Sequence, residues 1–121
     1  MSLAIQQLPD FVIPNGATVS NIVPKNAFED AWSILMFGPA AIVGGGTLTI
    51  QVTTDDTPSA VGNWSTLQRA AADVTAPAVT KAKAIGDDNG CVPACTGMRI
   101  SGTVAVTGAT TFKAQKIFEA R

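Results

Sequence analysis

The chain has 121 residues, with eight Lys and Arg against nine Asp and Glu, and a formal net charge of −1 at pH 7. This length predicts a single domain that is large enough to bury a core. The nearly balanced charge offers no basic surface to nucleic acid or an anionic membrane, and the absence of histidine removes the commonest general base and metal ligand. Charged residues make up only 14% of the chain, against about 25% in ordinary soluble domains, which indicates that part of the surface is covered by other protein.

The first half of the sequence has no pattern of a signal peptide or a membrane span. The first ten residues lack a basic segment followed by a sustained apolar one. Residues 31–54 are uncharged, but Gly38-Pro39 and the Gly44–Gly46 triplet interrupt them, so we expect strands and turns there. We expect residues 1–8 to form an N-terminal arm that reaches a neighbour, and residues 9–121 to form one domain.

Apolar runs and alternation predict the strands of the first half. Residues 11–13 stop at a Pro-Asn-Gly turn, and residues 18–23 resume an extended pattern. The apolar run from Trp32 to Phe37 is typical of a strand covered on both faces or of a strand in a sandwich core. The clearest signal is segment 47–53, where apolar and polar residues alternate and one face is expected to be buried. Its apolar positions are Leu48, Ile50 and Val52.

The second half repeats this pattern of short strands and turns. Further strands are predicted within residues 63–68, 74–85, 98–101, 103–107 and 110–118. Helix signals are limited to residues 26–32 and 67–74, and the second of these also fits a strand that leads into a loop. Seven to nine short strands separated by turns predict an all-β fold with little helix, a single antiparallel β-sandwich of jelly-roll type.

The acidic residues do not have the arrangement of a catalytic or metal site. They occur as the adjacent pairs Glu29-Asp30, Asp55-Asp56 and Asp87-Asp88, and such neighbours point to opposite faces of a strand or into water at a turn. A glycosidase needs two carboxylates that face each other across roughly 5–9.5 Å. The turn at residues 87–90 lacks the alternate acids and late Glu of a calcium loop. We therefore expect no enzyme activity, no metal site and no cofactor.

The cysteines leave several alternatives open. Cys91 and Cys95 are too few for a closed zinc site in a chain without histidine, and their spacing differs from the Cys-x-x-Cys redox motif. Free thiols, a short local disulfide, a bond between chains and a metal shared between subunits all remain possible.

Large apolar side chains provide candidates for an interface. Trp32 and Trp64 either anchor the core or an interface, or stack on sugars in a lectin-like site. We select Trp32, Met36, Phe37 and Trp64 as candidate interface residues.

The order of strands and turns resembles that of small β-sandwich virion proteins of tailed bacteriophages, especially those that decorate or cement the capsid. The resemblance lies in residues 11–20, 34–39, 47–52, 63–68, 98–100 and 111–114. It implies a non-enzymatic homo-oligomer, a dimer or trimer, that binds the major capsid protein and stabilises the shell by hydrophobic and main-chain contacts. Such a protein is assembled in the bacterial cytoplasm and is located on the capsid surface of the virion.

A second resemblance gives the alternative. The segment 47–52, together with Trp64 and Leu67, is also similar to galactose-binding-type sandwiches. It implies a receptor- or carbohydrate-binding module of a tail or fibre. A neck or tail-completion protein is a further alternative, and residues 91–95 lie outside the pattern of the decoration proteins.

Overall fold

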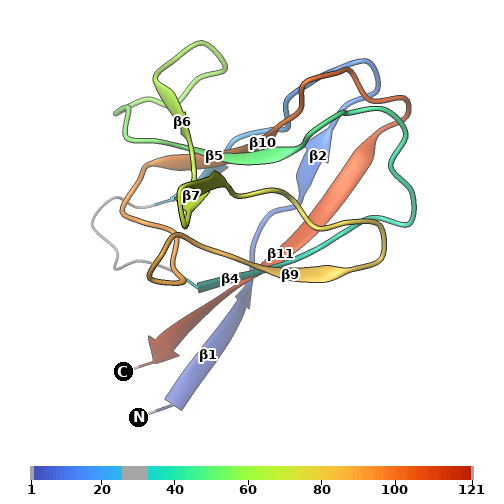
Figure 1. The fold of residues 1–121 in the computed structure, drawn as a ribbon. Coiled ribbons are helices and arrows are strands. Elements are labelled where there is room, and N and C mark those ends of the chain that lie inside the picture. Colours follow the sequence, from blue (N-terminus) through green and yellow to red (C-terminus); the bar gives the residue numbers. More distant parts are fainter. Residues whose placement is uncertain (1, 26–32, 121) are drawn as a thin grey trace.

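The computed structural model describes residues 2–25 and 33–120, with side chains at 4–25 and 33–117. These residues form eleven strands and no helix (Figure 1). The strands are β1 (Ser2–Gln7), β2 (Phe11–Ile13), β3 (Val23–Pro24), β4 (Ser33–Phe37), β5 (Thr49–Thr53), β6 (Trp64–Thr66), β7 (Gln68–Arg69), β8 (Ala72–Asp73), β9 (Ala82–Ile85), β10 (Gly97–Ser101) and β11 (Thr110–Ala120). The all-β prediction is confirmed, and the strand number exceeds seven to nine because β3, β7 and β8 have only two residues each.

The strands form two main sheets, and every strand pairing is antiparallel. The first sheet has the order β1-β11-β4-β9, and β2 also pairs with β11. The second sheet has the order β3-β10-β5-β6, and β7 and β8 form a separate hairpin. Residues 115–117 of β11 pair with both β1 and β4, so these two strands lie on opposite edges of β11. β11 is therefore the central strand around which the first sheet is built.

A common core lies between the two sheets. The first sheet contributes fully buried side chains from β2, β4 and β11, and the second contributes them from β5 and β10. The largest of these are Phe11, Phe112, Ile13, Met36, Ile50, Met98 and Ile100. In β11 the buried positions are Thr110, Phe112 and Ala114, which lie on one face of the strand.

Strands β4 and β5 bury one face each, with one departure from the predicted alternation. In β4, Ile34 and Met36 are buried and the residues between them are half-buried. In β5, Ile50 is buried as predicted, but Val52 is half-buried and Thr53 is 2% exposed. The Thr53 hydroxyl donates to the Asn63 carbonyl and accepts the Asp55 N–H, so its burial leaves no polar atom unsatisfied.

Three segments differ from the sequence-based expectations. Residues 2–7 of the predicted arm form β1, which pairs with β11 of the same chain at six positions. Residues 67–74 contain the β7–β8 hairpin rather than a helix. Residues 103–107 form turns with only the bridge Gly44↔Val106, because Gly102 and the turn that follows it interrupt the ladder. The helix candidate at 26–32 lies outside the described residues.

The ribbon of β1 and β11 projects from the body of the molecule, and the connections 54–63 and 102–109 lie at the opposite end (Figure 1). We call the connections 38–48, 54–63 and 102–109 the loop end.

Candidate functional site

A buried arginine of the second sheet holds the connection 54–63, one of the three connections of the loop end. Arg99, in the middle of β10, is only 9% exposed. Its Nε donates to Gln51 Oε1 at 2.8 Å, and its Nη1 donates to the Ala60 carbonyl at 3.0 Å. Its guanidinium also stacks over the Trp64 ring, 4.2 Å from the centroid. Burial lowers the pKa of Arg99, as expected for a cation that has lost part of its water.

A carboxylate holds the other side of the same connection. Asp55 accepts the Asn63 backbone N–H at 2.9 Å and its side-chain amide at 3.3 Å. These hydrogen bonds, the backbone one first, lower the pKa of Asp55 below its ordinary value, because they stabilise the charged form. Trp64 Nε1 donates to the Ser59 carbonyl at 2.8 Å. The connection 54–63 is thus fixed at both ends by side chains of the sheet and of the loop itself.

These contacts present an apolar side chain to the solvent. Val61 lies in the fixed connection and is 93% exposed. The connections 38–48 and 102–109 are joined by backbone hydrogen bonds, including Gly45 N to Ala105 O and Thr107 N to Val43 O. They expose Val43 and Val104 by 56% each. The loop end therefore carries three exposed valines on ordered backbone.

The glycine triplet makes the close approach of these two connections possible. Gly44 has a φ of +79°, and a Cβ at this position would lie 2.5 Å from the Ala105 carbonyl oxygen. Only glycine fits such a backbone at this distance.

The described candidate interface residues differ in how far they are buried. Met36 is fully buried in the core, so its assignment to an interface was wrong: the continuous apolar run of β4 alternates between a sealed face and a half-buried one. Phe37 is on the half-buried face. Trp64 is half-buried, with one ring face under Arg99 and its indole N–H satisfied. Trp32 lies outside the described residues.

Both cysteines are free thiols in the structure. Cys95 is 1% exposed and belongs to the core, and burial raises its pKa, with the charge of Lys25 acting in the opposite direction. Cys91 is half-buried, and its Sγ lies 3.7 Å from the Asn89 carbonyl oxygen.

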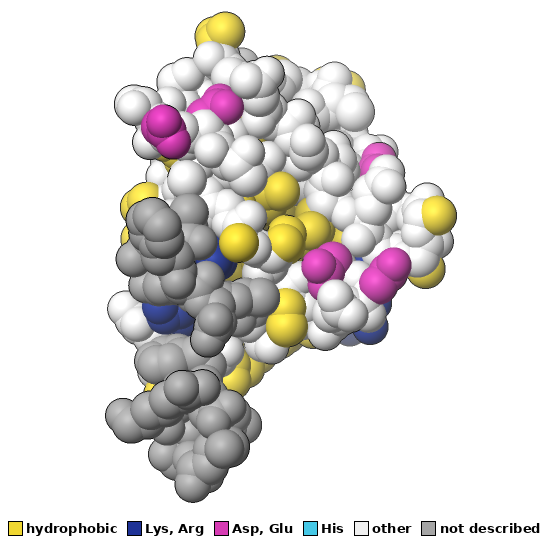
Figure 2. Space-filling view, turned by 90° about the vertical axis from the view of Figure 1, so that its left-hand side faces the viewer, with side chains coloured by type: hydrophobic (Ala, Val, Ile, Leu, Met, Phe, Trp, Pro, Cys, Tyr) yellow, Lys and Arg dark blue, Asp and Glu magenta, His cyan; other side chains and the backbone are white. Residues whose placement is uncertain are grey.

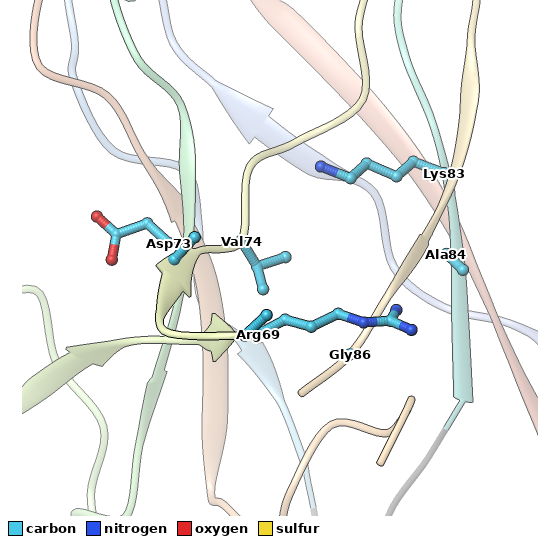
Figure 3. A pocket seen from close by; sticks show the side chains of 8 residues that line it. Arg69, Asp73, Val74, Lys83, Ala84 and Gly86 are labelled. Atoms are coloured by element: carbon cyan, nitrogen blue, oxygen red, sulfur yellow. The ribbon is translucent and has the colours of Figure 1, made fainter. Parts of the chain in front are cut away.

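A cavity of about 280 Å³ lies between the β7–β8 hairpin and β9 (Figure 3). The Arg69 side chain extends across it toward Gly86, and Asp73 points away from it. The ammonium of Lys83 is held by the carbonyl and hydroxyl oxygens of Thr75, at 2.9 and 2.8 Å. This lysine therefore closes the cavity wall rather than facing a ligand.

The acidic pairs serve the turns in which they lie. Asp87 Oδ1 accepts the backbone N–H of Asn89, and Asp88 Oδ1 accepts that of Ala70 at the tip of the β7–β8 hairpin. Within residues 4–25 and 33–117, no three Asp, Glu or Cys side chains come together as a metal site would require.

Figure 2 shows hydrophobic side chains gathered at the centre of one face, with acidic side chains toward its margins.

Sequence reasoning missed Arg99 and the exposed valines. The signal for Arg99 was available, because a single charge between Met98 and Ile100 in a predicted strand indicates a buried cation that needs partners. The valines had no such signal, since isolated apolar residues in loops are common.

Comparisons of the chain with protein-family models, curated proteins and solved structures find no match. Among the described residues, no helix is long and apolar enough to cross a membrane.

Proposed function

We propose that this chain is a non-enzymatic decoration protein of a bacteriophage capsid, which binds the major capsid protein and reinforces the shell. The observation that carries the proposal is the loop end, where Val43, Val61 and Val104 are exposed on connections fixed by hydrogen bonds. A second support is the low charge of the chain, 14% of residues. Exposed apolar side chains that gather at one end of a weakly charged chain are suited to contact with another protein.

Such a protein works through buried area. A standard interface of about 1,600 Å² supplies enough apolar contact for specific binding, and many copies on a symmetric shell add avidity. Because the valines carry no charge, binding is expected to change little between low and high salt. The ordered backbone of the loop end lowers the entropic cost of docking, since little chain has to be fixed on binding.

The alternative is a carbohydrate-binding module of a tail or fibre. The Trp64 ring is the group that would stack on a sugar, and Arg99 already covers one of its faces. Its indole N–H is also bonded to Ser59 and is not available to a ligand hydroxyl. These contacts favour the decoration protein over the sugar-binding module.

The test is binding to capsids that lack the protein. We expect the purified chain to co-sediment with such capsids and to raise the temperature at which they rupture. The double variant Val61→Asp/Val104→Asp should lose most of this binding, because two carboxylates would have to be buried without partners. Val79→Asp, in the connection between β8 and β9, is the matched control and should bind like the wild type. An unchanged rupture temperature together with specific glycan binding would overturn the proposal.

A further inference from the structure

The four edges of the two main sheets are unequally protected. Edge strands expose unpaired N–H and C=O groups, and proteins usually protect them by short length, lysine or proline. β3 has two residues and contains Pro24, β6 has three residues, and β9 carries Lys83. β1 has six residues, Ser-Leu-Ala-Ile-Gln-Gln, without charge or proline. Within the described residues it pairs only with β11, so its outer edge is open.

The hydrogen-bond pattern shows which groups of β1 face outward. Leu8 N donates to Ala114 O, and Leu8 continues the register in which Gln7 lies opposite Gln115. Hydrogen-bonded pairs alternate in an antiparallel ladder, so Ala4 and Gln6 direct their backbone groups toward β11. Leu3, Ile5 and Gln7 therefore direct theirs to the open edge.

This outward set is self-complementary about Ile5. A two-fold axis perpendicular to the sheet, midway between two β1 strands at the level of Ile5, would place Ile5 opposite Ile5 of a second copy. It would also place Leu3 opposite Gln7 in both directions. Each outward residue then meets an outward residue, which gives three hydrogen-bonded pairs with no group left over.

We propose that two copies of this chain associate through their β1 edges, antiparallel and with the two-fold axis at Ile5. The two first sheets, of five strands each, then become one ten-stranded sheet with β1 next to β1 at its centre. The Ile5 side chain, 66% exposed in the single chain, meets its symmetry mate across the axis.

The shape of the molecule leaves room for this contact. The β1–β11 ribbon projects from the body (Figure 1). In an antiparallel pair of ribbons, each body lies beyond the other ribbon's tip, so the two bodies are kept apart. This dimer goes beyond the proposed function, agrees with the homo-oligomer that the resemblance to decoration proteins implies, and can be tested without capsids.

The first experiment measures the mass of the full chain by analytical ultracentrifugation over a range of concentrations. We expect a reversible dimer with twice the 12.4 kDa of one chain. Ile5→Lys places two ammonium groups opposite each other at the axis, and it should weaken the dimer at least tenfold while leaving the fold intact. Val79→Lys adds the same charge away from β1 and should leave the dimer unchanged. A monomer at every concentration, or a dimer that Ile5→Lys leaves intact, would overturn the proposal.

The second experiment tests the register by oxidative cross-linking. Ile5→Cys should form a covalent dimer, because directly opposite residues have Cα atoms about 5.5 Å apart, within the range of a disulfide. Gln7→Cys should not, because the two copies of residue 7 would be offset by four residues, roughly 13 Å. The wild type under the same oxidant controls for Cys91. Equal cross-linking of the two variants would contradict the two-fold axis at Ile5, and an exchange of β1 between copies would leave Ile5→Cys without a cross-link.

Discussion

Arg99→Met tests whether the buried guanidinium holds the connection 54–63 in place. Methionine retains much of the apolar length of the side chain, so the change removes mainly the polar contacts. The lost contacts are the hydrogen bonds to Gln51 Oε1 and the Ala60 carbonyl and the stacking on Trp64. Two charge-assisted hydrogen bonds at about 1.5 kcal/mol each and a cation–π contact of about 1 kcal/mol sum to about 4 kcal/mol.

Part of that loss is offset, because the variant no longer buries a cation. Arg99 is 9% exposed in the folded chain, and relief of its desolvation returns about 1–2 kcal/mol. We therefore expect the free energy of unfolding to fall by about 2–3 kcal/mol, which lowers the melting temperature by about 10 °C in a domain of this size.

The assay is urea unfolding followed by far-ultraviolet circular dichroism, with the slope of free energy against urea compared between variants. The control is Arg69→Met, because Arg69 is exposed and makes none of these contacts; its effect should stay within about 0.5 kcal/mol. If the two variants unfold at the same urea concentration, the contacts of the guanidinium with connection 54–63 do not stabilise the fold and the explanation is refuted.

Three further predictions follow from individual residues. Ala70 and Ala71 have φ of +53° and +61°, a left-handed backbone that asparagine and glycine adopt more readily than alanine. The double variant Ala70→Asn/Ala71→Gly should therefore raise the free energy of unfolding by about 1 kcal/mol in the same urea assay. Asp55 has a lowered pKa in the folded chain. Its contribution to the free energy of unfolding is therefore complete above about pH 4 and is lost as the pH falls through the lowered pKa. In a pH series, Asp55→Asn should lose less stability in acid than the wild type does. Cys95 is buried with a raised pKa, and Cys91 is half-buried. Iodoacetamide should therefore modify Cys91 first and Cys95 only on unfolding, which mass spectrometry of peptides can show. Equal rates of modification for the two thiols would contradict the burial of Cys95.

Local patterns predicted the strands that bury one face. The alternation in residues 47–53, which contain β5, and the short run of β2 were sufficient to locate these strands, because the period of two and the turn residues after Ile13 are properties of the local sequence. The β7–β8 hairpin was not predicted, because its turn uses two alanines in a left-handed conformation in place of the usual Asn-Gly. A distant residue, Asp88, bonds to the N–H of Ala70 in that turn, and no local pattern contains this contact.

The candidate site was harder to predict for the same reason. Arg99, Gln51 and Trp64 meet only because β10, β5 and β6 are neighbours in one sheet. Their separation in sequence hides the cluster until the strand order is known. The strand in residues 2–7 was not predicted, because polar residues such as Gln6 and Gln7 argue against a core strand, whereas a ribbon that projects from the body needs no buried face.

The positions of the charges connect the two proposals. Arg99, Asp55, Lys83 and Asp88 are all occupied in holding connections in place, so the surface has fewer available charges than the composition suggests. β1 itself carries no charged residue, and the loop end lies at the opposite end of the molecule from the β1–β11 ribbon (Figure 1). Under the proposed dimer, the β1 edges cover each other and the two loop ends point away from the contact. One dimer then offers two apolar docking ends, and attachment of the first raises the effective concentration of the second at the shell. Weak contacts at each loop end would suffice to hold such a dimer across neighbouring capsid subunits, which is the property that a decoration protein requires.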